Sequence, residues 1–233
     1  MIRAVIFDLD NTLVDFMAMK TRAVEAAAWA MVDCGLPMSV EETTRGIFAT
    51  YDALGIEYQQ VFDQFLLTEL GYIDYKILAA GVVAYRKARE AALQPYPYVI
   101  ETITGLLRRG LKLAILSDAP RREAWLRLCQ VNLHHFETVV TYEDTGFRKP
   151  SPEPFRRVLK DLGVEPQEAI MVGDWPERDM AGSKSVGLWT AWAKYGTQAP
   201  AASVETDYEL NEVRDLIRVI DGISAQAELK GKE

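Results

Sequence analysis

The sequence contains few of the residues that bind soft metals or form disulfides. Its 233 residues include two cysteines and two histidines. Cys34 and Cys129 lie far apart without the CxxC spacing of zinc or redox sites, so we expect both to be reduced thiols in the core. His134 and His135 are adjacent and point in different directions, so we expect them to pack in a loop or core. This inventory argues against a zinc site and a disulfide framework.

Long apolar segments and excess positive charge are also missing. No apolar run reaches the roughly 20 residues that a membrane helix needs, and Asp8 interrupts any signal-peptide core. Aspartate and glutamate number 34 against 26 lysines and arginines, giving a net charge of −8. We therefore expect a cytoplasmic protein with no membrane and no nucleic-acid partner. A small anionic substrate is compatible with this charge, because a metal ion and a few local cations can outweigh it.

Short apolar runs alternate with helical patterns through most of the chain. The runs are nearly continuous, which is typical of parallel strands covered on both faces. They occupy residues 4–10, 111–117, 138–141, 169–174 and 188–193. Helical patterns occupy 99–109, 121–131, 154–162, 177–185 and 211–220, and we expect residues from 224 onward to fray. The alternation predicts a doubly wound, Rossmann-like α/β core with its site at the carboxyl ends of the strands.

Residues 16–94 interrupt this alternation. They contain no convincing strand, and helical patterns occupy 20–34, 40–54, 58–70 and 74–92. Gly35, Gly55 and Gly71 separate these patterns, as glycines that end helices do. We therefore predict an α-helical domain over 16–94, inserted into an α/β core made of 1–15 and 95–233.

Polar side chains follow the predicted strands at the points where the strands end. Asp8, Asp10 and Thr12 follow the first, Ser117 and Asp118 the second, Lys149 lies in the next connection, and Asp174 and Asp179 follow the fourth. Carboxylates gathered at one rim would repel one another, and a divalent cation would relieve that repulsion. Oxygen ligands without histidine or cysteine indicate Mg²⁺.

Phosphoryl transfer is the chemistry that this inventory suits. The metal and Lys149 would neutralise phosphoryl oxygens, and Ser117 would donate hydrogen bonds to them. A carboxylate nucleophile would divide hydrolysis into two steps through an aspartyl-phosphate.

These segments resemble the four motifs of the haloacid dehalogenase-like (HAD) superfamily, whose members are mainly phosphatases. The resemblance rests on residues 8–13, 117–118, 148–150 and 173–179, and extends from residue 4 to about residue 193. The helical insertion occupies the position of the family's C1 cap. The resemblance implies a phosphatase of this superfamily, a Mg²⁺-dependent phosphohydrolase that cleaves phosphomonoesters of small metabolites.

The resemblance also implies roles for single residues. Asp8 would be the nucleophile and a Mg²⁺ ligand. Asp10 would bind Mg²⁺ through its backbone carbonyl, protonate the leaving group and then activate water, and Asp174 would complete the metal ligands. Lys149 would act in catalysis and in substrate binding, and Asp179 would support the metal and the lysine.

Three further residues are assigned to substrate binding. Thr12 would support the loop that carries the nucleophile, and Ser117 and Asp118 would lie against the phosphoryl group. Several of these candidate site residues could instead have a purely structural role. Residues 10–12 could form an ordinary polar turn, and residues 117–118 could cap the following helix. Trp175 follows Asp174 directly, and it could either line the site or lie outside it.

Other activities of the same family stay open. A phosphomutase resembling β-phosphoglucomutase would use Asp8 and Asp10 in the same way. A 2-haloacid dehalogenase would release halide, but that branch generally lacks an acid two residues after the nucleophile, and Asp10 is present here. A non-catalytic binding subunit would have lost motif residues, and none is missing. The substrate and the choice between monomer and homodimer do not follow from the sequence.

Overall fold

The computed structural model describes residues 1–197 and 204–230. Its internal contacts separate two compact units. The core unit contains Met1–Asp15 and the chain from Gln94 onward, and the helical unit contains Phe16–Leu93. None of the helices in the described ranges is both long and apolar enough to cross a bilayer.

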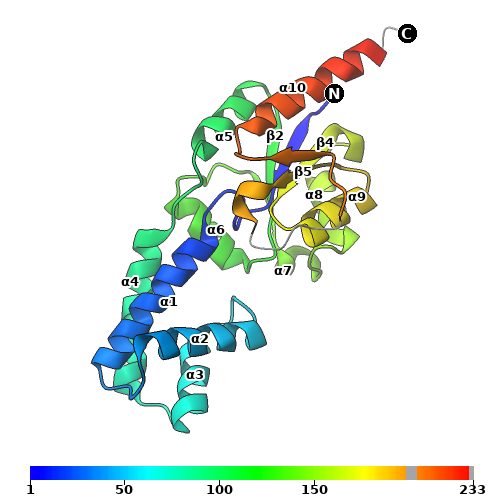
Figure 1. The fold of residues 1–233 in the computed structure, drawn as a ribbon. Helices are drawn as coiled ribbons and strands as arrows, with labels where there is room; N and C mark the ends of the chain where they lie inside the picture. Colours follow the sequence, from blue (N-terminus) through cyan, green and yellow to red (C-terminus); the bar gives the residue numbers. More distant parts are fainter. Residues whose placement is uncertain (198–203, 231–233) are drawn as a thin grey trace. The chain divides into compact units, whose positions relative to one another are not determined.

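A six-stranded parallel sheet forms the centre of the core unit, in the order β3-β2-β1-β4-β5-β6 (Figure 1). The strands are β1 (Ala4–Phe7), β2 (Lys112–Leu116), β3 (Thr138–Val140), β4 (Ala169–Gly173), β5 (Trp189–Ala193) and β6 (Tyr208–Leu210). This order confirms the predicted doubly wound sheet. The predicted runs were one to three residues too long, and β6 was missed because three residues with an exposed glutamate make no apolar run.

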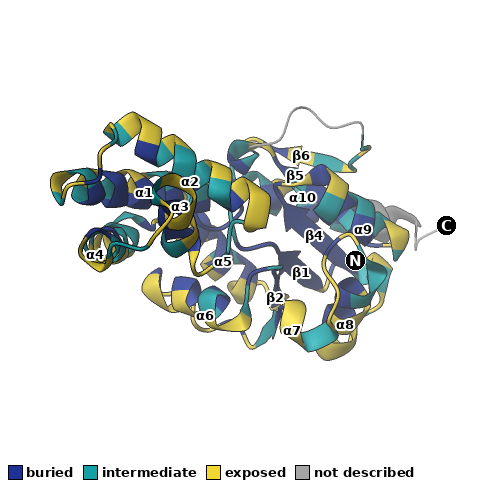
Figure 2. Cartoon of the chain, turned by 90° about the horizontal axis from the view of Figure 1, so that it is seen from below, coloured by how far each residue is buried: buried dark blue, intermediate teal, exposed yellow. Residues whose placement is uncertain are grey.

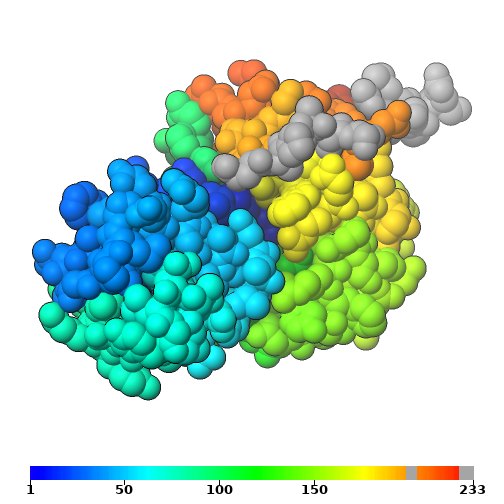
Figure 3. All heavy atoms as spheres, turned by 60° about the horizontal axis from the view of Figure 1, so that its bottom comes forward, coloured from blue at the N-terminus to red at the C-terminus, as the bar shows by residue number. Residues whose placement is uncertain are grey.

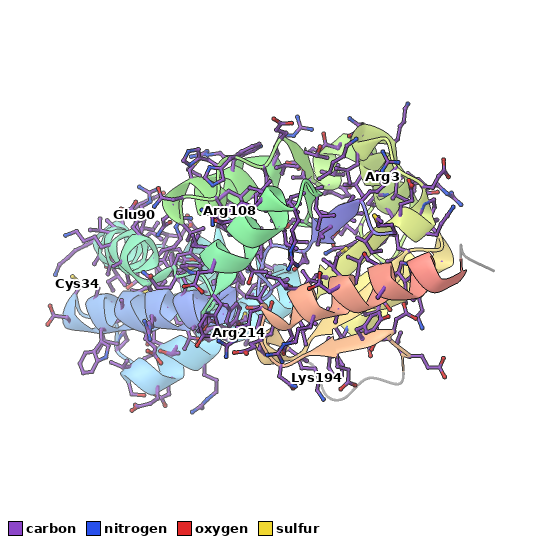
Figure 4. All side chains as sticks on the ribbon, turned by 90° about the horizontal axis from the view of Figure 1, so that it is seen from above. Arg3, Cys34, Glu90, Arg108, Lys194 and Arg214 are labelled. Atoms are coloured by element: carbon purple, nitrogen blue, oxygen red, sulfur yellow. The ribbon has the colours of Figure 1, made fainter. Side chains whose placement is uncertain are left out.

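Helices cover both faces of this sheet, with α5 and α10 on one face and α8 and α9 on the other (Figure 1). The bounds are α5 (Val99–Arg108), α6 (Arg121–Gln130), α7 (Tyr142–Thr145), α8 (Pro152–Leu162), a π-helical turn (Pro176–Met180), α9 (Ala181–Ser185) and α10 (Asp215–Lys230). Short 3₁₀ turns occupy Pro166–Glu168 and Lys194–Gly196. Residues 224–230 were expected to fray, but they continue α10 to Lys230, and the rest of that predicted tail, 231–233, lies outside the described residues. Arg214, labelled in Figure 4, lies 4.1 Å over the ring of Tyr98 and links α10 to α5.

The strands have nearly continuous apolar sequences because helices bury them from both faces of the sheet. All four residues of β1 are buried, and β1 with its neighbours β2 and β4 forms the dark interior of the core unit in Figure 2. On one face, Ile6 and Met171 pack with Phe155 of α8 in a single buried cluster. Each fully buried side chain of this size contributes about 1.5–3 kcal/mol. The surfaces of α8 and of the segment after β4 lie side by side in the space-filling view (Figure 3).

The helical unit consists of four helices packed around their own apolar core. They are α1 (Phe16–Asp33), α2 (Val40–Leu54), α3 (Val61–Leu70) and α4 (Tyr75–Ala92). Met31, Ile47 and Phe65 are fully buried in this core. Ser39 begins α2 with a reciprocal capping box to Glu42, which satisfies backbone donors that a helix start leaves open. Whether this unit acts as a cap stays a prediction.

Both cysteines are free thiols, but neither lies in the core as expected. Cys34 is half-buried after the end of α1, where Figure 4 labels it, and Cys129 is exposed on α6. His134 and His135 are exposed neighbours whose rings lie 4.9 Å apart in an edge-on contact. Cys34 packs at the edge of the core of the helical unit, whereas Cys129 occupies an exposed position of α6, so the apolar character of cysteine predicted burial only in part.

One glycine late in the chain allows close packing against the loop that follows β1. A Cβ atom on Gly196 would lie 1.5 Å from the backbone oxygen of Asn11. Asn11 has a left-handed backbone with φ of 58° and donates its N–H to Val14 O at 2.8 Å, so this loop is tightly turned. Any side chain at position 196 would therefore push the loop away.

We predict that Gly196→Ala lowers the free energy of unfolding by about 1–3 kcal/mol or more, because it overpacks a backbone contact. Gly222→Ala is the matched control, since a Cβ on this helical glycine meets nothing within 4 Å. The control should be neutral or stabilising by about 0.5–1 kcal/mol. Denaturant unfolding of both variants measures the difference, and equal stabilities would contradict the close packing.

Candidate active site

Asp8 is fixed in place by the end of β1. Its backbone N–H donates to Val172 O of the neighbouring strand β4 at 2.8 Å. Its carboxylate accepts a hydrogen bond from the hydroxyl of Thr12 at 3.4 Å, and the side chain of Thr12 is fully buried. The carboxylate of Asp8 is therefore held at the rim of the sheet, between the ends of β2 and β4.

Lys149 joins three elements through its ammonium group. Nζ donates to Asp8 Oδ1 at 2.6 Å, to Asp179 Oδ1 at 2.6 Å and to the carbonyl oxygen of Leu116 at 3.2 Å. An ammonium group has three protons, so these contacts use all of them. The lysine is 6% exposed and Asp179 only 1%, which makes this a buried ion-pair network rather than a surface one.

Asp8, Asp174 and Asp179 together form a group with the chemistry of a metal site. Each offers one carboxylate oxygen, these oxygens lie within 4.8 Å of one another, and all three residues are buried. The group contains no nitrogen or sulfur donor, which suits a hard cation such as Mg²⁺. One ammonium faces three carboxylates here, so a divalent cation would also balance the charge.

The predicted metal ligands were Asp8, Asp10 and Asp174. Two of them lie in this group together with Asp179, which was expected to support the ligands. The assigned ligand atom of Asp10 is its backbone carbonyl, and this role stays a prediction.

Crowding and burial shift the protonation of the group. Burial raises the pKa of Asp8 to about 7, with the charges of Asp179 and Asp10 adding to the rise and Lys149 opposing it. Burial, Asp8 and Asp179 raise the pKa of Asp174 to about 9. Burial lowers the pKa of Lys149, but Asp179 and Asp8 outweigh burial and hold it above its usual value. Lys149 therefore stays a cation, and Asp8 and Asp174 bind their protons more tightly than ordinary carboxyl groups because their pKa values are raised.

Asp118 connects the loops around Lys149. One carboxylate oxygen accepts from the backbone N–H of Lys149 at 3.0 Å, and the other pairs with Arg178. The carbonyl oxygen of Asp118 accepts from the guanidinium of Arg148 at 3.0 Å. Ser117 is buried beside it, with Oγ accepting from the N–H of Ala119 at 3.1 Å. The substrate-binding roles of Ser117, Asp118 and Thr12 stay predictions, while these contacts show how the residues brace the site.

The π-helical turn after β4 carries Asp179 inward. The N–H of Trp175 donates to Asp179 Oδ2 at 3.0 Å, and a Cβ on Gly173 would lie 2.4 Å from that same oxygen. Glycine at position 173 is therefore needed for the close approach of Asp179 to the strand end. Trp175 itself is 45% exposed, with the guanidinium of Arg178 4.9 Å from its ring centre.

Two contacts at the site involve residues that the sequence analysis missed. Arg127 of α6 pairs with a carboxylate oxygen of Asp10. Tyr195 donates from its hydroxyl to the carbonyl oxygen of Thr12 at 2.9 Å. A signal for Arg127 exists in the sequence, since it lies three residues after Ala124 and one before Leu128, on the apolar face of its helix. No comparable pattern marks Tyr195.

Known proteins resemble this chain over most of its length. The family model of the haloacid dehalogenase-like hydrolases matches residues 2–187. A glyceraldehyde 3-phosphate phosphatase from Methanocaldococcus jannaschii is 31% identical over 225 residues, which cover 96% of this chain and 99% of that protein. A second protein of that name, from Methanopyrus kandleri, is 34% identical over 228 residues, with 94% and 97% covered.

A solved structure shares the fold over nearly the whole chain. It is described as a HAD phosphatase from Thermococcus onnurineus and is similar with a TM-score of 0.69 and 26% identity. The similarity covers 94% of this chain and 98% of that chain.

The raised carboxyl pKa values predict that Mg²⁺ stabilises the protein more strongly as pH rises. In the folded state without metal, Asp8 and Asp174 hold protons up to about pH 7 and 9, whereas in the unfolded state they lose them near 3.8. Their contribution to stability is therefore present at low pH and is lost as pH rises through these folded values. Bound Mg²⁺ would remove this loss.

Thermal unfolding midpoints in EDTA and in Mg²⁺ measure this effect across the pH range. We expect the two curves to meet at low pH and to separate above neutrality. Asp174→Asn should raise the midpoint in EDTA at high pH and abolish most of the Mg²⁺ effect, because it removes one of the crowded charges. Coincident curves at every pH would contradict the metal site.

Proposed function

Because the chain belongs to the haloacid dehalogenase-like hydrolases, we propose that it is a Mg²⁺-dependent phosphatase acting through an aspartyl-phosphate on Asp8. The observation that carries the proposal is the buried contact of the Asp8 carboxylate with the Lys149 ammonium, beside Asp174 and Asp179. A carboxylate held by a permanent cation at the rim of a parallel sheet is placed to attack an anionic phosphoryl group.

The reaction would proceed in two balanced steps. In the first, a carboxylate oxygen of Asp8 forms a bond to phosphorus while the ester P–O bond breaks, and the leaving oxygen takes a proton from Asp10. In the second, water attacks the phosphorus, Asp10 takes the proton of the water, and inorganic phosphate leaves Asp8. Lys149 faces the charge that develops on the phosphoryl oxygens. Mg²⁺, held by Asp8, Asp174 and the carbonyl of Asp10, would supply further positive charge to these oxygens.

We propose phosphomonoesters of small metabolites as the substrates, with glyceraldehyde 3-phosphate as the first to test. The names of two relatives, which cover 96% and 94% of this chain, support this choice. We also propose that the helical unit is the cap that sets specificity. A helical unit as large as Phe16–Leu93, acting as a cap, would cover a small-molecule site, which favours a metabolite over a folded phosphoprotein as the substrate.

We predict Mg²⁺-dependent phosphate release from glyceraldehyde 3-phosphate and from a generic aryl phosphate. EDTA should abolish it, and Asp8→Asn should lower kcat by more than about 10³-fold, because the nucleophile is removed. Asp161→Asn is the matched control, since Asp161 forms a surface pair with Arg157 on α8 and should leave the rate unchanged. Trapping of phosphate on the wild-type protein but not on Asp8→Asn would identify the covalent intermediate.

Each alternative gives a different outcome in the same set of assays. A phosphomutase would convert one sugar phosphate into its isomer with little release of phosphate. A dehalogenase would release halide from a 2-haloacid without Mg²⁺. A binding subunit would show no turnover of any ester while remaining folded. Any of these results would overturn the proposal.

A further inference from the structure

Arg127 is a buried arginine whose guanidinium reaches the carboxylate of Asp10. Its side chain is 7% exposed, against 22% for Asp10. It lies on the inner face of α6 together with Ala124 and Leu128, where an apolar residue would ordinarily pack. The contact joins positions 117 residues apart, so the fold brings the two side chains together.

The other arginines at the start of this helix behave differently. Arg121 and Arg122 are both exposed, and Arg121 pairs with Asp144 at 2.6 Å on the surface. Removing a guanidinium from water is unfavourable unless a charged partner compensates for the lost hydration. The burial of Arg127 therefore depends on a carboxylate partner, and Asp10 supplies one.

The geometry points to Arg127 as a positioning residue for Asp10, an inference that rests on the proposed function. We infer that the guanidinium fixes the orientation in which Asp10 delivers its proton to the leaving oxygen. Asp10 lies in the turn after β1, next to Asn11 with its left-handed backbone. A carboxylate on such a turn has several rotamers, and a planar guanidinium with N–H donors in a fixed fork selects one of them.

The step that Arg127 assists is the transfer of one proton. The proton moves from the Asp10 carboxyl to the ester oxygen as the P–O bond to Asp8 forms and the P–O bond to the leaving group breaks. Arg127 keeps all its protons throughout. Misorientation of Asp10 would therefore slow the reaction most for esters whose leaving oxygen is strongly basic and needs the proton.

Two aryl esters of similar size separate this role from a structural one. Phenyl phosphate has a more basic leaving oxygen than 4-nitrophenyl phosphate, and kcat/KM reports the first phosphoryl transfer for both. For Arg127→Met we expect kcat/KM to fall about 10–100-fold with phenyl phosphate and only a few-fold with 4-nitrophenyl phosphate. The kcat/KM values of Arg127→Lys should lie between those of Arg127→Met and the wild type, again with the larger loss on phenyl phosphate. Arg122→Met, on the same helix, should leave both values unchanged.

Coupling to Asp10 is the second readout. If Arg127 acts through Asp10, the double variant Asp10→Asn with Arg127→Met should be no slower than Asp10→Asn alone. Equal losses on both esters, or additive losses in the double variant, would overturn the inference. If circular dichroism shows that Arg127→Met is unfolded, the test is made with Arg127→Lys, using the same comparison of kcat/KM for the two esters. Failure of the proposed function looks different, because the wild type would then release no phosphate or Asp8→Asn would stay active.

Discussion

The ion pairs of Lys149 with Asp8 and Asp179 are the interaction on which the site depends. They lie almost wholly out of water, and removing one member of a buried pair commonly costs about 3–5 kcal/mol, because the other charge is left uncompensated. Much of the surrounding structure keeps these groups together. Asp118 holds the backbone of Lys149, and Trp175 holds the second oxygen of Asp179. The site is therefore a network whose parts stabilise one another.

The strand order explains how distant residues enter this network. β1 lies between β2 and β4, so the carboxyl end of β1 is flanked by Ser117 on one side and Asp174 on the other. Lys149 comes from a connection and not from a strand end, and it reaches the rim because its ammonium also binds the last carbonyl of β2. The same arrangement leaves a net negative charge that suits a divalent cation.

Sequence patterns predicted most of this fold for clear physical reasons. Buried parallel strands need continuous apolar runs, and their ends carry the polar residues, so the sheet and the set around Asp8 were readable. Short elements without an apolar run were not readable in this way. β6 and α7 contain three and four residues, too few to show a period, and the π-helical turn after β4 reads as part of an ordinary helix. Arg127 was missed because a charged side chain on a helix is usually placed at the surface.

The close contacts of Tyr195 and Gly196 with the loop after β1 join a late segment of the core to its first strand. Ala4 pairs with Lys112 in β2 and with Ala169 in β4, so β1 has its first neighbour only after about a hundred further residues and its second only after β4. During synthesis, the segment carrying Asp8 therefore leaves the ribosome well before the strands that flank it. A nascent chain thus leaves one edge of the apolar β1 unpaired until β4 has been made.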